Sequence, residues 1–161
     1  MFVQDFQVMD VPFEEVVACL GAGTKALLGT ALEGARAEGE RLRSKVGPSG
    51  WPAVLSKTVE IRSTRLRRHG DCVLLSFCWV ASGGASLFPA LEGDLEVAPL
   101  GEGQTQLVLR GRYEPPGGAL GRGLDRLVLH RLAESTIRAF LTSACAALGR
   151  QAPQHAAASA C

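Results

Sequence analysis

The sequence lacks an excess of charge of either sign and has no closely spaced cysteine pairs. Its 17 lysines and arginines nearly balance 16 aspartates and glutamates, which leaves a net charge of +1. This balance gives no overall field that would attract nucleic acid or an anionic membrane. The five cysteines are odd in number and form no C-x-x-C pair, so neither a disulfide framework nor a zinc site is indicated. We therefore expect a reducing, cytoplasmic compartment and no metal or other cofactor.

Motifs for nucleotide binding and for nucleophilic catalysis are also missing. No phosphate loop of the form G-x-x-x-x-G-K-[ST] and no catalytic triad stand out in the 161 residues. Residues 21–26, with the sequence GAGTKA, have the spacing of a dinucleotide-binding turn. That turn belongs to a repeated βαβ pattern, whereas the following sequence is typical of antiparallel hairpins. We expect a turn between two helices at this point.

Targeting and membrane-spanning segments are not predicted. The N-terminal residues show no basic region followed by an apolar region, so secretory targeting is not expected. Residues 72–91 are uncharged and as long as a spanning helix, but a Gly-rich centre at 82–86 and Pro89 divide them into a strand and a loop. We expect no integral membrane association.

The length of the chain suits one domain with one hydrophobic core, which we place at residues 1–149. Residues 150–161 are rich in alanine and are expected to form a flexible tail. Periodicity predicts a strand at 2–9, two short helices at 12–20 and 23–35, and strands at 38–46, 55–67, 72–81, 91–97 and 104–113. The sheet is expected to be antiparallel.

Two adjacent strand pairs have particularly clear patterns. Segments 55–67 and 72–81 flank Gly70, which predicts a hairpin with its turn at that glycine. The second arm, 73–80, is apolar on both faces, as expected for a strand covered on each side. In segments 91–97 and 104–113 the acidic residues of one strand would face the arginines of the other, if the two strands pair.

The last predicted element is an amphipathic helix from about Leu120 to Leu148, which Gly149 would end. At about 1.5 Å per residue it would span on the order of 40 Å, enough to cross a curved sheet. Its apolar stripe comprises Leu129, Leu132, Ala133, Ile137, Phe140, Leu141, Ala144 and Leu148.

This order of elements resembles the SRPBCC or START-like superfamily, and most of all its polyketide cyclase/dehydrase-like members. The resemblance covers nearly all of residues 1–149. It depends on the order of elements, on Tyr113-x-Pro115-Pro116-Gly117 before the last helix, and on two segments, 87–95 (LFPALEGDL) and 130–137 (HRLAESTI).

The resemblance implies a helix-grip fold of the α+β class. A curved antiparallel sheet of six to seven strands would wrap around the long C-terminal helix, with two short helices after the first strand. It also implies a cavity between sheet and helix that binds a hydrophobic small molecule, such as a lipid, an isoprenoid or a polyketide-like compound. Such a fold fits many functions, so the ligand is not defined by it.

Apolar pockets are walled by aromatic and aliphatic side chains with a few polar groups for orientation. The residues that we predict to contact a ligand combine these two kinds. They are Phe77, Trp79, Phe88, Tyr113, Ser76, Leu95, Leu109, His130, Ala133 and Ile137.

Two alternative functions remain open from the sequence. The first is a cyclase or dehydratase in which His130, Tyr113 or Lys57 transfers protons, and it requires at least two of these side chains to converge. For each residue a structural or solvent-exposed role competes with this one. The second is a protein-interaction module that uses basic residues of 41–45 and 62–68. No stacking aromatics accompany these charges, so nucleic acid is not expected as a partner.

Overall fold

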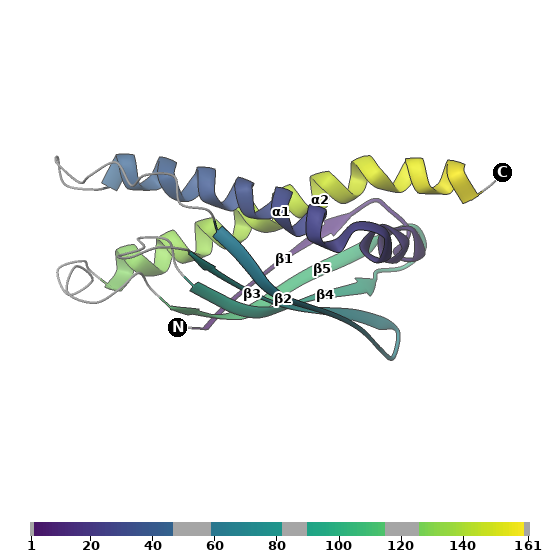
Figure 1. Cartoon of the computed structure of the whole chain (residues 1–161), viewed down its shortest axis with the longest axis horizontal. Coiled ribbons are helices and arrows are strands. Elements are labelled where there is room, and N and C mark those ends of the chain that lie inside the picture. The colour runs from purple at the N-terminus through teal and green to yellow at the C-terminus, as the bar shows by residue number, and fades with distance from the viewer. Residues whose placement is uncertain (1, 47–58, 82–89, 115–125, 160–161) are drawn as a thin grey trace.

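A computed structural model describes residues 2–46, 59–81, 90–114 and 126–159. Along the chain, the elements are β1 (Phe2–Met9), α1 (Phe13–Val46), β2 (Val59–His69), β3 (Cys72–Ala81), β4 (Ala90–Pro99), β5 (Thr105–Glu114) and α2 (Arg126–Ser159). The strands form one sheet in the order β1-β5-β4-β3-β2, and both helices lie on the same side of it (Figure 1). The α+β class is confirmed, with five strands among the described residues where six to seven were expected.

All strand pairs of the sheet are antiparallel, as predicted. The β2–β3 hairpin closes at the pair His69 and Cys72, and Gly70 has a φ of 59°, a conformation that favours glycine in a tight turn. The β4–β5 hairpin closes at Pro99 and Thr105. Both predicted hairpins are therefore confirmed within the described residues.

One face of the sheet is buried beneath the helices, and we call it the interior face. On β3 this face carries Val73, Leu75, Phe77 and Trp79, all of which are buried. The alternate residues of β3, such as Leu74 and Cys78, are only half-buried. The prediction that this strand is covered on both faces was wrong, because both helices pack on the same side of the sheet.

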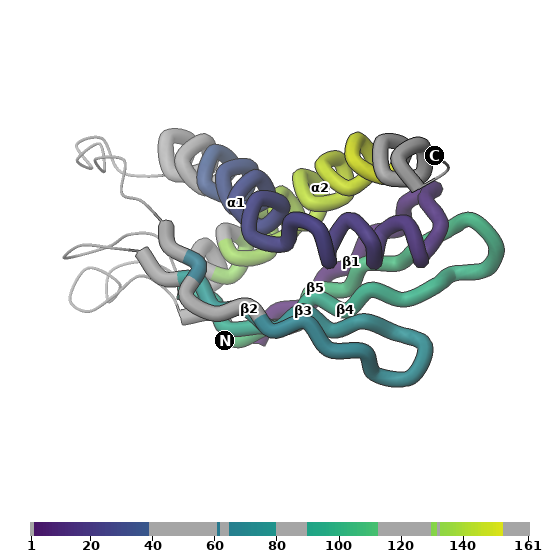
Figure 2. The backbone as a smooth tube through the Cα atoms, turned by 45° about the vertical axis from the view of Figure 1, so that its right-hand side comes forward, coloured from purple at the N-terminus to yellow at the C-terminus, as the bar shows by residue number. Residues whose placement is uncertain are grey.

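Helix α1 corrects two predictions for residues 12–46. The break expected at Gly21 lies at Gly23, where non-helical dihedrals divide α1 into two helical segments (Figure 2). The second segment continues to Val46, so the strand predicted at 38–46 is helical. The alternation of Arg41, Arg43 and Lys45 with other residues indicated a strand. Arginine, lysine, leucine and glutamate are also good helix formers, and here helix propensity prevails.

Helix α2 was predicted in kind but not in its end. It begins at Arg126 within the described residues and continues to Ser159, past Gly149, where the sequence predicted its end. The segment predicted to be a flexible tail is therefore helical up to Ser159. A glycine inside a helix costs only about 1 kcal/mol relative to alanine, and the alanines that follow favour the helix. The domain limits 1–149 themselves stay a prediction.

The two helices pack against each other as well as against the sheet. Gly34 of α1 and Ser143 of α2 lie in close contact. A Cβ atom added at Gly34 would overlap Ser143 Oγ and would lie 2.8 Å from Ser143 Cβ. The glycine therefore allows the helix backbones to approach, and a longer side chain would separate them.

Replacing Gly34 by alanine is expected to destabilise the protein by about 1–3 kcal/mol, because the overlap with Ser143 outweighs the better helix propensity of alanine. Gly29→Ala in the same helix is the matched control. A Cβ atom there meets nothing within 4 Å, so this change should stabilise by about 0.5–1 kcal/mol. Urea denaturation measures both.

Adding Ser143→Gly to Gly34→Ala should restore part of the lost stability, because it removes the atoms that overlap. If Gly34→Ala is as well tolerated as Gly29→Ala, the close contact between the helices does not exist in solution.

The segment Phe13–Glu38 of α1 is long and apolar enough to cross a membrane by length and composition alone. Core helices of soluble proteins pass the same test, and one such segment is weak evidence. Its large apolar residues Leu20, Leu27 and Leu28 are buried in the hydrophobic core. Core packing therefore accounts for the apolar character of this segment.

Candidate functional site

The candidate site is the region between the interior face of the sheet and α2. Side chains from adjacent strands form rows across this face. Leu75, Leu95 and Leu109 form one such row, and Val73, Val97 and Leu107 form the next; all six residues are buried. Helix α2 covers these rows with buried residues at helical spacing, namely Ala133, Ile137, Phe140, Leu141 and Ala144.

Three aromatic side chains meet between β3 and α2. The ring centroids of Phe77 and Phe140 are 5.5 Å apart and their planes differ by 17°, so the rings are stacked. Trp79 lies 5.2 Å from Phe140 and 5.7 Å from Phe77. All three are almost completely buried. Centroid separations of about 4.5–7 Å are favourable for aromatic pairs, so this cluster fixes α2 against the sheet.

Two glycines lie opposite each other beside this cluster. Gly93 of β4 pairs with Gly111 of β5, and Gly93 also pairs with Phe77 of β3. A Cβ atom added at Gly93 would lie 2.5 Å from the carbonyl oxygen of Arg110. The strands are closer together here than side chains allow. The interior face therefore has a row in which two side chains are missing next to Phe77.

Most of the predicted ligand-contacting residues share this interior. Phe77 and Trp79 belong to the aromatic cluster, and Leu95, Leu109, Ala133 and Ile137 are buried around it. The backbone of Tyr113 pairs with that of Leu91, a residue of the interior face that also pairs with Trp79. Phe88 and Lys57 lie outside the described residues.

Ser76 and His130 do not point into this interior. Ser76 lies on the opposite face of β3, where its hydroxyl donates to Asp94 Oδ1 at 2.5 Å. His130 is 43% exposed, and its Nε2 lies 3.1 Å from Glu134 Oε1, one helical turn along α2. His130 is the one proposed proton-transfer residue whose side chain is described, so the convergence of two such side chains stays a prediction.

Phe140 is the residue of this cluster that was not predicted as a site residue, although it belongs to the predicted apolar stripe of α2. Its sequence signal was available, because it follows Ala133 and Ile137 by seven and three positions and so shares their helix face. No local sequence pattern indicates that α2 packs against β3. Proximity between distant elements comes from the complete fold.

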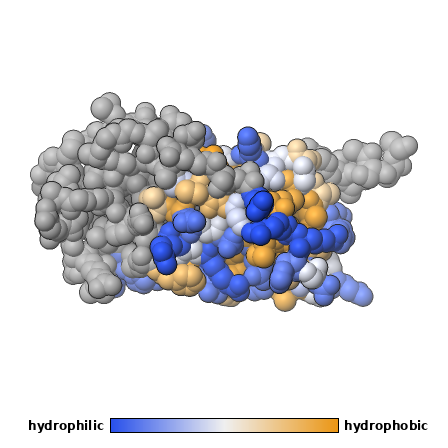
Figure 3. Space-filling model, turned by 60° about the horizontal axis from the view of Figure 1, so that its bottom comes forward, coloured by the Kyte–Doolittle hydropathy of each residue, from blue (hydrophilic) through white to orange (hydrophobic). Residues whose placement is uncertain are grey.

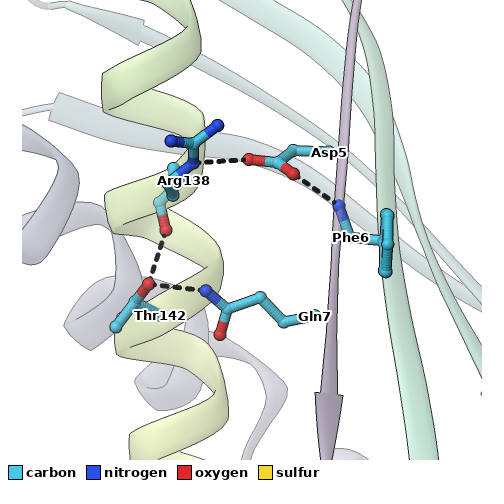
Figure 4. A network of polar contacts seen from close by, with 5 residues as sticks. All are labelled: Asp5, Phe6, Gln7, Arg138 and Thr142. Atoms are coloured by element: carbon cyan, nitrogen blue, oxygen red, sulfur yellow. Dashed lines mark hydrogen bonds and ion pairs between the residues drawn. The ribbon is translucent and has the colours of Figure 1, made fainter.

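Helix α2 contacts β1 through polar side chains. Arg138 Nε lies 3.2 Å from Asp5 Oδ2, and Gln7 Nε2 donates to Thr142 Oγ1 at 2.7 Å (Figure 4). Asp5 Oδ1 also accepts the backbone N–H of Phe6 at 2.9 Å. Asp5 and Gln7 occupy the rows of the interior face that carry leucine and valine on the other strands. One side of α2 is therefore held by polar contacts near solvent.

The Asp5–Arg138 ion pair is expected to contribute only about 0.2–1 kcal/mol, because Arg138 is 71% and Asp5 24% exposed. A double-mutant cycle with Asp5→Asn and Arg138→Gln, followed by urea denaturation, measures this coupling energy. The coupling energy should decrease further in 1 M salt, because the Debye length is then about 3 Å and exposed charges are screened. A coupling well above 2 kcal/mol would show that the pair is shielded from water.

Among the described residues, two cysteine thiols have a shifted pKa. Burial raises the pKa of Cys145 to about 11, and burial together with the negative charge of Glu15 raises the pKa of Cys19. Both therefore remain protonated at neutral pH, and neither is an activated nucleophile. Among the described residues, no group of three His, Cys, Asp or Glu side chains could hold a metal ion.

The basic residues do not form the strand-to-strand surface that was considered from the sequence. Residues 41–45 belong to α1, whereas Arg65, Arg67 and Arg68 are exposed on β2. Arg68 forms an ion pair with Glu14 at 2.9 Å. The alternative hypothesis of a basic patch on two adjoining strands was therefore wrong.

No protein-family model and no curated protein matches this sequence. Solved structures with a similar fold include a conserved protein from Geobacillus kaustophilus, with 14% identity, a TM-score of 0.52, and coverage of 94% of this chain and 97% of that one. The Zhui aromatase/cyclase from Streptomyces sp. R1128 has 15% identity, a TM-score of 0.47 and 94% coverage of both chains. The lipid transfer and protein localization domain of human StarD13 has 12% identity, a TM-score of 0.41, and coverage of 88% and 76%.

The structure from Geobacillus kaustophilus, with a TM-score above 0.5, shows that this chain shares its overall fold. At these identities the likeness concerns the fold alone.

Proposed function

We propose that this protein binds a hydrophobic small molecule between the interior face of the sheet and α2. The observation that carries the proposal is the aromatic cluster of Phe77, Trp79 and Phe140, which lies between these two elements and is buried. The hydrophobic core that includes this cluster also contains many aliphatic side chains. Such an environment favours apolar compounds by removing their surface from water, at about 25 cal/mol per Å².

The proposed binding position is next to the paired glycines. Gly93 and Gly111 leave two side chains out of the row that contains Phe77. Aromatic rings beside a stretch of bare backbone offer flat surfaces for an apolar or planar ligand. A lipid, an isoprenoid and a polyketide-like aromatic compound are the three classes that we propose to test.

Trp79 provides a direct optical test of this position. The chain has two tryptophans, and Trp51 lies outside the described residues. In a Trp51→Phe variant, tryptophan emission therefore reports on Trp79 alone. Titration with oleic acid, farnesol and a planar anthraquinone should change the Trp79 emission in a saturable manner for at least one compound. Native mass spectrometry of protein purified from its own host would show whether a ligand is already bound.

A matched variant separates binding at the cluster from binding elsewhere. Trp79→Phe in the wild-type background removes the Trp79 signal, so the part of the emission change that comes from Trp79 should be lost in this variant. If no compound changes the emission of Trp79 and the purified protein carries no ligand, the proposed function is wrong.

We also propose that the protein is located in the cytoplasm. The described cysteines Cys19, Cys72, Cys78 and Cys145 are all free thiols. Free thiols persist in a reducing compartment, whereas secreted proteins usually oxidise them. Fluorescence of a tagged copy in the native host would test this location.

A further inference from the structure

Strand β1 presents three large apolar side chains to solvent, whereas its Val3 and Met9 are buried in the core. Phe2 is 66% exposed, Phe6 58% and Val8 43%, whereas the polar Asp5 and Gln7 lie on the interior face. We call the sheet surface turned away from the helices the outer face. Several large exposed apolar residues on one strand are typical of an interaction surface.

The strands beside β1 add charges of opposite sign to the outer face. Strand β5 carries Arg110 and Arg112, which pair in register with Asp94 and Glu92 of β4. This confirms that acidic residues face arginines across these strands, and Arg110 Nη1 also lies 2.8 Å from Glu96 Oε2. Figure 3, which turns the lower side of the molecule toward the viewer, shows hydrophobic and hydrophilic areas side by side.

Strand β3 adds uncharged residues to the outer face, and β2 beyond it, at the edge of the sheet, carries the exposed Arg65 and Arg67. Leu74, Ser76 and Cys78 lie on the outer face and are half-buried. Across the strand order β1-β5-β4-β3, the outer face is therefore apolar, basic, acidic and largely apolar. If a second copy lies on this face with its four strands in the reverse order, basic residues meet acidic ones and apolar strands meet apolar strands.

The strand register determines which residues would face each other in a dimer of this kind. A two-fold axis parallel to the strands, between β5 and β4, places β5 over β4 of a second copy. Residues of one row then face each other, so Arg110 lies opposite Asp94 of the second copy, and Arg112 lies opposite Glu92 of the second copy. Opposite charges meet at both positions.

The same axis places β1 over β3 of the second copy. Phe6 shares a row with Leu74, Gln4 with Ser76, and Phe2 with Cys78. Between β1 and β3 of the dimer, apolar side chains therefore face apolar ones and the glutamine faces the serine, whereas Val108 of β5 lies opposite Glu96 of the second copy. An axis centred on β4 would instead place acids on acids, and one centred on β5 would place arginines on arginines.

We propose that the outer face is the interface of a two-fold symmetric homodimer, in which β5 packs over β4 and β1 over β3 of the second copy. Symmetric pairs of this kind are the commonest soluble oligomers. Sheets packed face to face lie about 10 Å apart, a distance that arginine and glutamate side chains can bridge. The dimer also removes Phe2 and Phe6 from water.

The dimer is expected to be weak. With about 4.8 Å between strands and 3.3 Å per residue, four strands of about seven residues cover roughly 19 by 23 Å. This is smaller than the standard interface of about 800 Å² per partner. We therefore expect a dimer in reversible exchange with monomers, visible as an increase in mass with protein concentration.

A charge exchange tests the arrangement directly. Arg112→Glu places like charges opposite each other in its own homodimer, and Glu92→Arg does the same with the opposite sign. Each variant alone should sediment as a monomer at concentrations where the wild type dimerises, from about 5 to about 500 µM. An equimolar mixture should dimerise again. In the mixed dimer, positions 112 and 92 of one variant face positions 92 and 112 of the other, and each facing pair has opposite charges. Circular dichroism verifies that both variants are folded.

A second pair of variants tests the apolar contact. Phe6→Ser should weaken the dimer at least tenfold, whereas Leu100→Ser should leave it unchanged. Leu100 is similarly exposed but lies outside the strands, between β4 and β5. A wild-type protein that remains monomeric throughout this range would overturn the proposal. A dimer that survives both charge variants, or a mixture that stays monomeric, would do so as well.

Discussion

Replacing Phe140 by alanine is expected to lower the free energy of unfolding by about 3–5 kcal/mol. Phe140 is fully buried and contacts both Phe77 and Trp79, so the change removes two aromatic contacts and leaves a cavity. The cost of such cavities increases with their residual volume, because packed neighbours relax only in part. Urea denaturation followed by circular dichroism measures the difference in stability.

Two controls separate this packing effect from a general effect of mutation. Phe140→Leu keeps an apolar side chain of intermediate size and should cost clearly less than the alanine variant. Leu100→Ala, in an exposed position, should stay within about 0.5 kcal/mol of the wild type. If Phe140→Ala costs less than 1 kcal/mol, then α2 does not pack on β3 as the structure shows.

The alanine variant also bears on the proposed function. A cavity beside Phe77 and Trp79 would be lined by apolar side chains, and such cavities bind small apolar molecules. Phe140→Ala should therefore change the affinity for the compound, measured by titration of the Trp79 emission, provided that the compound binds at this position.

The sheet could largely be predicted from the sequence, because the patterns of its strands are local. Alternation in 91–97 and 104–113 defined two strands and the pairing of acids with arginines. The turn at Gly70 was predictable because few other residues adopt a positive φ without strain. In each case the decisive information lies within about ten residues.

The helices were less predictable, since their limits depend on a balance between weak local preferences. Residues 38–46 alternate like a strand, yet their helix propensity and the preceding helix prevail. Gly149 was expected to end α2, but the alanine-rich sequence after it continues the helix. Gly34 lies within the segment predicted as the second short helix, and in the structure it allows α1 to approach Ser143.

The candidate site was predictable only as a set of apolar positions. Phe77 and Trp79 are buried, but Ser76, which directly precedes Phe77, lies on the opposite face, since alternate residues of a strand point to opposite sides. The sequence did not indicate which face α2 would cover. His130 lies on α2, yet its ion pair with Glu134 and its exposure follow from the orientation of the helix.

Replacing Gly93 by alanine is expected to destabilise the protein by about 1–3 kcal/mol or more, because the added Cβ atom has no space. It would lie 2.5 Å from the carbonyl oxygen of Arg110 and 3.0 Å from the Cα atom of Gly111. Both obstacles are backbone atoms, which cannot rotate away as a side chain can. Strands β4 and β5 would have to separate, which would disturb the row that contains Phe77. Thermal and urea denaturation measure the loss.

Gly149→Ala provides the control for this substitution. Gly149 lies within α2, and a Cβ atom there would meet nothing within 4 Å, so alanine should stabilise by about 0.5–1 kcal/mol. The two changes add the same methyl group but should act in opposite directions. If Gly93→Ala also stabilises the protein, the close approach of β4 and β5 is absent in solution. The proposed ligand position next to these glycines would then lose its structural basis.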